Sequence, residues 1–310
     1  MSLRIERIYP NESHQYHQWA QQFGDIFSNP GWLSIQSATS ATYVIKDDSN
    51  LLGCFTMNQE KKWGIHLFRN PYFTPHIGWS WQHSSTKTSS QNNTWKSAMH
   101  LMIDFFKQYP LAKIQISFPP SVIDLQPFVW SGYKVSPKYT YQINLNQNLD
   151  AIRSQLSSSH RNHYNKAKKD GVKWEISHEP EKMEQLVTYT LKRKRQKFNK
   201  DYLRNILHHF CNSDNSIMCL AYLDGSPIAG ATVIYNQQKA YLLFSGYDEE
   251  KKHGGAGIGC VLELIESCKK IQIPIFDFEG SMLEEVEQYF RGFGGQIIPY
   301  LNVSKLGITR

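Results

Sequence analysis

A glycine-rich run in the second half of the chain has residue types suited to holding a phosphate. The run His253-Gly-Gly-Ala-Gly-Ile-Gly259 lies between a predicted strand and a predicted helix. Glycine allows a tight turn and a close backbone approach to a ligand, because no Cβ atom intervenes. Unpaired N–H groups at the start of a helix also favour an anion. We therefore expect a phosphate-bearing ligand at Gly254, Gly255, Gly257 and Gly259; a turn without chemistry is the alternative.

Positive charge is concentrated in one segment of the chain. The net charge is +7, and residues 151–200 alone carry 13 Lys and Arg against 5 Asp and Glu. This segment holds two basic clusters, which are Arg161, Lys166, Lys168 and Lys169, and then Lys192, Arg193, Lys194, Arg195 and Lys197. Such clusters predict contact with a nucleotide, tRNA or a phosphorylated acceptor. A solvated helix face is the alternative, and we favour it for residues 192–197.

Two carboxylates near the end of a predicted strand, residues 273–280, have the chemistry of a general base. Alternation along a strand puts Asp277 and Glu279 on one face and Phe276 and Phe278 on the other. A carboxylate there could accept the proton of an amine nucleophile. The alternative is that Asp277 has a structural role as a cap or pairing partner, while Glu279 is exposed. Tyr247, after another predicted strand, could donate a proton, although we favour simple packing for it.

Composition limits the class of protein. A chain of 310 residues with 40 % hydrophobic residues predicts two globular domains. No apolar run approaches the ~20 residues that span a bilayer, and the N-terminus has no apolar stretch typical of a signal peptide, so we expect a cytoplasmic protein. The five cysteines contain no CxxC pair, and the twelve histidines are scattered. We therefore expect neither disulfides nor a metal site.

The order of predicted elements indicates a mixed α/β fold. In the second half, an antiparallel meander over residues 217–248 is followed by the glycine run, a helix over 260–270, the strand over 273–280, a helix over 282–295 and a last strand over 297–305. The first half has a weaker version of this order. A duplicated α/β domain is therefore expected, with domains 1–145 and 146–310. An aromatic loop in the first half suggests either an acceptor wall or core packing by Tyr72, Phe73, Trp79 and Trp81.

Three passages, in this order, resemble the Fem-type branch of the GNAT acyltransferase superfamily. The passage from Ser159 to Gly171 resembles the family's basic helix R-x-x-x-x-K-A-x-K-x-G. The second is AYLDGSPIAGATVIY with AYLLFSGYD and the glycine run. The third, Phe276-Asp-Phe-Glu-Gly-Ser281 with Tyr289-Phe-Arg-Gly-Phe-Gly294, is similar to D-F-x-G-S and F-K-x-x-F-G. The resemblance covers roughly residues 140–305.

The resemblance implies two tandem GNAT-like domains, each a mixed central sheet flanked by helices. It implies an N-acyltransferase that moves an acyl or aminoacyl group directly to an amine in an inter-domain cleft, with the acceptor bound by the first domain and the donor by the second. Arg291 occupies the family's Lys position, where a cation could stabilise an oxyanion or a leaving phosphate; a surface Arg at a helix end is the alternative. The expected catalytic set is Asp277, Glu279, Arg291 and Tyr247, and the donor set adds Arg161, Lys166, Ser281 and Phe290 to the glycines.

The identity of the donor stays open. Gly254 stands where the coenzyme A turn of the family, Q/R-x-x-G-x-G/A, has Gln or Arg. Acyl-CoA is slightly favoured as co-substrate over aminoacyl-tRNA, with no permanently bound cofactor, and the acceptor is expected to be a small-molecule, peptide or saccharide amine. A cell-wall precursor ligase that uses aminoacyl-tRNA is one alternative. A ligand-binding protein that keeps the fold without catalysis is another.

Overall fold

A computed structural model of the chain describes residues 3–9, 13–48, 50–195, 198–280 and 282–308. The chain divides into two compact units, unit 1 (Met1–Lys138 and Pro299–Arg310) and unit 2 (Tyr139–Ile298). The chain enters unit 2 along β7 (Lys134–Asn144) and returns to unit 1 along β13 (Gln296–Ile308). The sequence alone suggests a single boundary near residue 145. Among the described residues, no helix is both long and apolar enough to cross a membrane.

Unit 1 is built on a mixed sheet with the strand order β1-β2-β3-β4-β6-β13, and β5 pairs with β3. Its remaining strands are β1 (Leu3–Ile8), β2 (Ser40–Asp47), β3 (Asn50–Lys62), β4 (Ile65–Arg69), β5 (Ser80–Trp81) and β6 (Leu111–Ser117). Strands β4 and β6 are parallel, whereas β13 runs antiparallel to β6. The helices of this unit are α1 (His14–Phe23), the 3-10 turn η2 (Ile26–Ser28), α2 (Pro30–Gln36), α3 (Thr88–Lys107) and α4 (Gln126–Trp130).

The core of unit 1 is rich in aromatic rings. Trp79 is buried and stacks on Phe55 and Trp81, with ring centroids 5.8 and 5.9 Å apart. The apolar stripe of α3, with Met102 and Phe106, packs in the same cluster. Trp79 is therefore a core residue, which is one of the two interpretations of the aromatic loop. Large aromatic side chains stabilise a fold most when they are removed from water.

In unit 2 the strands follow the order β7-β12-β11-β10-β9-β8. Its other strands are β8 (Lys173–Ser177), β9 (Ser216–Leu223), β10 (Ser226–Tyr235), β11 (Ala240–Tyr247) and β12 (Ile275–Asp277). The meander β9-β10-β11 is antiparallel, as predicted, and β11 and β12 are parallel. The helices are α5 (Leu149–Ser154), α6 (Ser158–Lys169), α7 (Pro180–Arg193), α8 (Lys200–Asn205) with the π-helical turn η3 (Ile206–Phe210), α9 (Ala256–Lys270) and α10 (Glu284–Arg291). The predicted mixed α/β class is confirmed.

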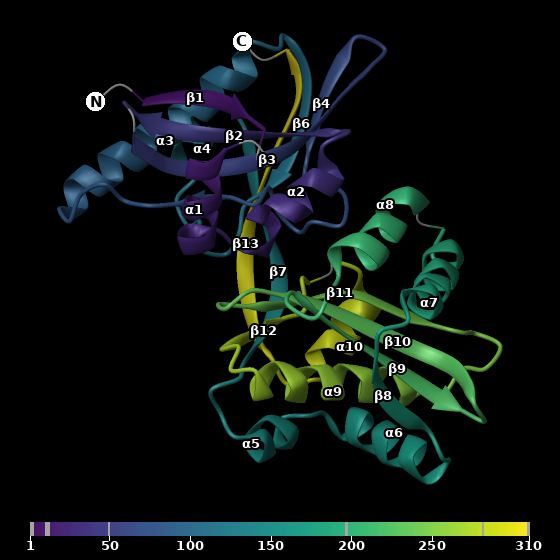
Figure 1. The fold of residues 1–310 in the computed structure, drawn as a ribbon. Coiled ribbons are helices and arrows are strands. Elements are labelled where there is room, and N and C mark those ends of the chain that lie inside the picture. The colour runs from purple at the N-terminus through teal and green to yellow at the C-terminus, as the bar shows by residue number, and fades with distance from the viewer. Residues whose placement is uncertain (1–2, 10–12, 49, 196–197, 281, 309–310) are drawn as a thin grey trace. The chain divides into compact units, whose positions relative to one another are not determined.

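Helices cover both faces of the unit 2 sheet (Figure 1). Helix α9 packs against β8, β9 and β10, and α7 packs against β10 and β11. The facing glycines Gly230 and Gly246 make the α7 contact possible. A Cβ atom on Gly246 would lie 2.5 Å from the backbone of Leu186 in α7. The glycine pair thus lets α7 lie directly on the sheet.

Local structure differs from the prediction at three places around the predicted site. The sequence favours one basic helical region over residues 149–171, but the structure has two helices there, α5 and α6, because the Ser157 side chain caps α6 by accepting from the N–H of His160, at 3.2 Å. Helix α9 begins at Ala256, so half of the glycine run is helical. Strand β12 ends at Asp277, and Glu279 has a left-handed backbone with φ of 59°. The predicted alternation therefore does not extend to Glu279.

Candidate functional site

A pocket of about 540 Å³ lies within unit 2, between the end of α7, strands β10 and β11, the glycine run and α10. Four of the predicted residues line it, namely Tyr247, Gly254, Gly257 and Phe290. Strand β11 forms one wall with Ser245–Tyr247, and the first turn of α9 forms another. The pocket therefore brings together the end of a strand, the start of a helix and the glycine run. The sequence shows only the order of these three elements along the chain.

The four glycines of the run have two different roles. Gly254 and Gly257 line the pocket. A Cβ atom on Gly255 would overlap the carbonyl oxygen of His163 in α6, and one on Gly259 would overlap the indole ring of Trp174. These two glycines are needed for helix packing. Gly257 has more room, because a Cβ atom there would meet only the Tyr289 hydroxyl, at 3.4 Å.

The start of α9 presents backbone donors to the pocket. Gly255 at the N-cap has no side chain that could accept a hydrogen bond from the first turn. The N–H of Ala256 donates to the carbonyl of His253, and the regular helical bonds begin at Gly259. Within the described part of the chain, the N–H groups of Gly257 and Ile258 have no acceptor. Both residues line the pocket, so two donors at the positive end of a 15-residue helix lie at its wall.

His253 holds the beginning of this turn in place. Its Nδ1 accepts the N–H of Gly255 at 3.2 Å, and its Nε2 lies 3.0 Å from Oδ2 of Asp170. With Nδ1 as an acceptor, the proton of the neutral ring is on Nε2, which then donates to the carboxylate. The turn is therefore fixed to the end of α6 before any ligand arrives.

Three cationic side chains line the pocket, namely Arg193, Lys194 and Lys252. The Arg193 guanidinium lies over the Tyr247 ring at 4.0 Å, and the Lys252 ammonium lies 5.5 Å from the same ring. Burial and the neighbouring Arg193 lower the pKa of Lys194, although Glu285 opposes that change. For the charged run over residues 192–197, the sequence favours a solvated helix face. Arg193 and Lys194 instead line the pocket, and Lys197 lies outside the described residues.

Helix α10 closes the pocket with Glu285, Val286, Tyr289 and Phe290. Burial raises the pKa of Tyr289 well above its usual value, with a smaller contribution from Cys260. Its hydroxyl is therefore a protonated donor at neutral pH. The sequence alone does not single out Tyr289 as a site residue. The sequence signals that could identify Tyr289 are its position one helical turn after Glu285 and next to Phe290, and the small number of apolar residues in that helix.

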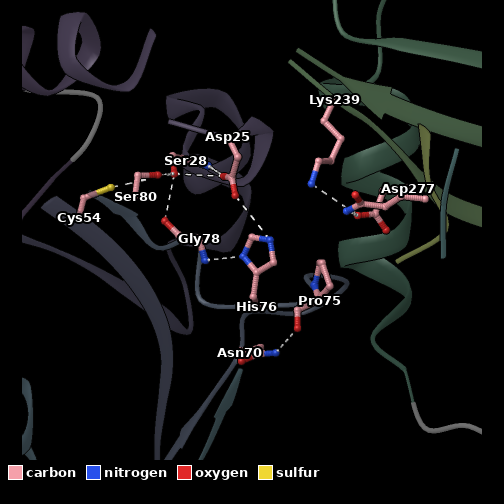
Figure 2. A network of polar contacts seen from close by, with 11 residues as sticks. Asp25, Ser28, Cys54, Asn70, Pro75, His76, Gly78, Ser80, Lys239 and Asp277 are labelled. Carbon is pink, nitrogen blue, oxygen red and sulfur yellow. Dashed lines mark hydrogen bonds and ion pairs between the residues drawn. The ribbon is translucent and has the colours of Figure 1, made fainter. Parts of the chain in front are cut away.

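The predicted carboxylates lie outside the residues that line this pocket. Asp277 is buried and accepts hydrogen bonds from Thr140 at 2.6 Å, from Gln142 at 2.7 Å and from the Glu279 N–H at 2.8 Å. Lys239 adds an ion pair at 3.6 Å (Figure 2). These partners occupy both carboxylate oxygens, which agrees with the structural pairing considered for Asp277.

Glu279 has a different environment. Its Oε1 is buried without a hydrogen-bond partner among the described residues. Burial and the nearby Asp277 carboxylate raise the pKa of Glu279 well above its usual range. A carboxyl with a raised pKa holds its proton at neutral pH, so it is poorly suited to take a proton from an amine.

The other predicted residues are spread over unit 2. Arg161 is exposed and donates to the Leu156 carbonyl at 2.6 Å, which closes the break between α5 and α6. Lys166 is exposed in the last turn of α6. Arg291 is exposed on α10 and pairs with Glu287 at 3.0 Å. None of these three lines the pocket, and Ser281 lies outside the described residues.

A buried polar network in unit 1 fixes the aromatic loop (Figure 2). Asp25 accepts from the Ser28 N–H at 3.0 Å and lies 3.5 Å from Nε2 of His76, while Nδ1 of His76 accepts the Gly78 N–H at 3.1 Å. Burial raises the pKa of the Cys54 thiol beside this network to about 12. Because only a thiolate is an effective nucleophile, Cys54 is inert at neutral pH.

Comparison with known proteins supports the same fold. Residues 155–291 match the family model described as the acetyltransferase (GNAT) domain. No curated protein sequence matches the chain. The crystal structure of FemX superposes with a TM-score of 0.66 over 96 % of each chain, at 14 % identity. A tandem GNAT protein from the clavulanic acid biosynthesis pathway superposes with a TM-score of 0.54, at 10 % identity, over 98 % of this chain and 97 % of its own.

A third similar structure is the C-terminal domain of a putative lysylphosphatidylglycerol synthetase from Agrobacterium fabrum. Its TM-score is 0.57 at 11 % identity, over 90 % of this chain and 87 % of that domain. Identities this low establish the fold alone. The family match assigns a GNAT domain to residues 155–291, and the structural likenesses show that the chain as a whole shares its fold with FemX and with the tandem GNAT protein.

Proposed function

We propose that the protein is an N-acyltransferase whose unit 2 pocket binds a phosphate-bearing acyl donor. The observation that carries the proposal is the pair of N–H groups, on Gly257 and Ile258, that lack an acceptor among the described residues and lie at the pocket wall, at the start of α9. Such groups bind phosphate because the helix dipole adds to their hydrogen bonds. Arg193, Lys194 and Lys252 on the same pocket would balance further negative charge on the donor.

In the proposed reaction, the amine nitrogen attacks the acyl carbonyl carbon of the donor. A C–N bond forms, and the C–S bond of a thioester or the C–O bond of an aminoacyl ester breaks. The leaving thiolate or alkoxide needs a proton, and we place the Tyr289 hydroxyl, which lies at the pocket beside Gly257, as its donor. No covalent enzyme intermediate is required, and none of the described residues that line the pocket is a cysteine.

The amine must also lose a proton. Asp277 is saturated with hydrogen bonds, and Glu279 holds its own proton, so neither carboxylate fits this role well. Glu285 is the carboxylate that lines the pocket and is the better candidate, because it is exposed at the pocket wall. An amine that arrives neutral from solution still loses one proton when it becomes an amide, and that proton balances the one that the leaving thiolate or alkoxide takes up.

The donor is proposed to be an acyl-CoA thioester, with aminoacyl-tRNA as the competing donor. Coenzyme A carries a diphosphate that suits two adjacent N–H donors, and the pocket volume is in the range of small-molecule sites. Aminoacyl-tRNA would engage the exposed lysines of α6 as well. Isothermal titration with acetyl-CoA, coenzyme A and an aminoacyl-tRNA separates the two. Binding of coenzyme A that persists at high salt supports the thioester, whereas exclusive, salt-sensitive binding of the tRNA refutes it.

A ligand-binding protein without catalysis is the second candidate function. It is favoured by the full hydrogen bonding of Asp277, which leaves that predicted base occupied. Mass spectrometry of amine libraries incubated with protein and acetyl-CoA distinguishes the two functions. Donor binding with no acylated product over many amines would support this second candidate and contradict catalysis.

A further inference from the structure

The turn between β3 and β4 in unit 1 exposes a tryptophan almost completely. Trp63 is 99 % exposed at the tip of a two-residue hairpin turn, between the paired residues Lys62 and Ile65. The hairpin extends as an arm, because β2 pairs with β3 only as far as Asn58. Figure 1 shows this arm projecting past the neighbouring strands of unit 1. The side chain therefore contributes nothing to the core of the fold.

The backbone at this turn is unsuited to tryptophan. Trp63 has φ of 48° and Gly64 has φ of 80°. A turn with positive φ at both central positions strongly favours Asn-Gly, because a bulky side chain is strained in the left-handed region. Asparagine at position 63 would therefore give this turn with less backbone strain than tryptophan. Strain of this kind, kept at a fully exposed aromatic, points to a role outside the fold.

Further exposed aliphatic side chains lie beside the arm on one face of the sheet. Ile65 in β4 is 40 % exposed, and Leu111, in the neighbouring strand β6, is 52 % exposed. Leu306 in β13 is 79 % exposed and pairs with Lys113 of β6. The register places all three on the face opposite α3, where no core side chains cover them among the described residues. Trp63 and these aliphatics form what we call the hairpin surface.

The charge of the hairpin surface is positive. Lys113, beside Leu306, is exposed on this face and pairs with no carboxylate within the described part of the chain. Lys61, near the tip of the arm, is also exposed, but its pairing with His66 puts it on the α3 face. Lys62 pairs with Glu60 on this face, and Glu6 of β1, on the same face, pairs with Arg4 and Lys46. A second copy meeting the surface across a two-fold axis would bring like charges together, which opposes self-association. The surface is instead complementary to an anionic partner.

We infer that the hairpin surface docks the protein on an anionic lipid membrane. A tryptophan on a protruding tip suits the headgroup region, where its ring is apolar and its N–H stays hydrated. The aliphatics add apolar area beside it, and the lysines add attraction to acidic headgroups. The contact is peripheral and reversible, and it is independent of the function proposed for unit 2.

Flotation of the full chain with vesicles tests the inference. Vesicles of phosphatidylcholine with about 30 % phosphatidylglycerol should bind the protein at least about tenfold better than phosphatidylcholine alone, and binding should weaken as salt rises. Trp63→Asn should reduce binding about tenfold without lowering Tm, since asparagine suits the turn. Lys113→Gln should reduce it about fivefold. Trp130→Ala is the matched control, because Trp130 is also exposed (63 %) in unit 1, beside Lys96.

Several results would overturn the inference. These are wild-type protein that ignores the anionic vesicles, Trp63→Asn protein that binds them like wild type, and equal losses in the Trp63 and Trp130 variants. Light scattering that shows a dimer dependent on Trp63, without vesicle binding, would assign the surface to a second copy. Binding to an acidic protein in place of vesicles would likewise exclude the membrane.

Discussion

Gly257 and Gly259 lie two residues apart in α9, and the structure predicts opposite effects when each is replaced. Gly257→Val places its side chain in the pocket, where the new Cβ atom would lie 3.4 Å from the Tyr289 hydroxyl. Glycine inside a helix costs up to about 1 kcal/mol relative to alanine and valine costs less, so the variant should be at least as stable as wild type. Donor binding, however, should fail.

The loss of affinity can be worked out from the two N–H groups. A hydrogen bond to a charged group contributes about 1.5–3 kcal/mol. Blocking the approach of a phosphate to Gly257 and Ile258 therefore costs about 3 kcal/mol or more, which is roughly a 150-fold increase in Kd. Isothermal titration with coenzyme A measures this value, and urea unfolding measures stability on the same samples.

Gly259→Ala is the matched comparison. Its Cβ atom would overlap the Trp174 ring, whose N–H is held at 2.8 Å by the carbonyl of Ala256. Overpacking of this kind costs about 1–3 kcal/mol of stability. We expect a lower Tm here, with donor affinity nearly preserved in the folded fraction. If Gly257→Val binds coenzyme A like wild type, or if it unfolds while Gly259→Ala is unaffected, the assignment of the two glycines is refuted.

Three further predictions concern side chains in and near the site. Tyr289→Phe should lower turnover about 100-fold and leave the donor Kd within about twofold, because only the proton donor is removed. Turnover assays and isothermal titration measure the two values. Unchanged turnover would exclude Tyr289 as the acid. Glu279→Gln should match wild-type stability near pH 4 and exceed it at pH 7 in urea unfolding. The raised pKa means that the folded protein holds this proton more tightly than the unfolded chain does. The stability of the wild type therefore falls as pH rises above the unfolded-state pKa of about 4.3. Parallel curves of stability against pH for the two proteins would contradict this. Asp277→Asn should cost about 2 kcal/mol of unfolding free energy, because the new amide N–H₂ faces the Gln142 donor; a wild-type Tm would show that the network is dispensable.

Much of the fold can be predicted from the sequence because its local signals are strong. Alternating apolar residues predict the meander β9-β10-β11, and so does the Asp224-Gly225 turn, which has positive φ at both residues. The glycine run follows strand β11 and leads into helix α9, although the helix begins within the run, at Ala256. These features depend on neighbours in the chain, which a single sequence contains.

The site is harder to predict because it depends on which faces meet in space. Arg193 and Lys194 belong to a charged run, and only the packing of α7 on β10 and β11 brings them to the pocket. Tyr289 looks like part of a family motif, but its contact with the first turn of α9 joins elements some thirty residues apart. Asp277 is a plausible base by sequence, and only the folded chain brings three donors to its carboxylate.

The return of β13 to unit 1 has a consequence for the order in which the chain is synthesised. Residues Asn302–Ile308 complete the ladder with Leu111–Ser117 of β6, and Asn302 is translated 185 residues after Ser117. Unit 2, in contrast, is a continuous stretch and is available to fold earlier. During translation, β6 leaves the ribosome with one edge unpaired, and such an edge is prone to aggregate. Expression of this protein should therefore be unusually sensitive to truncation or fusion at its last strand.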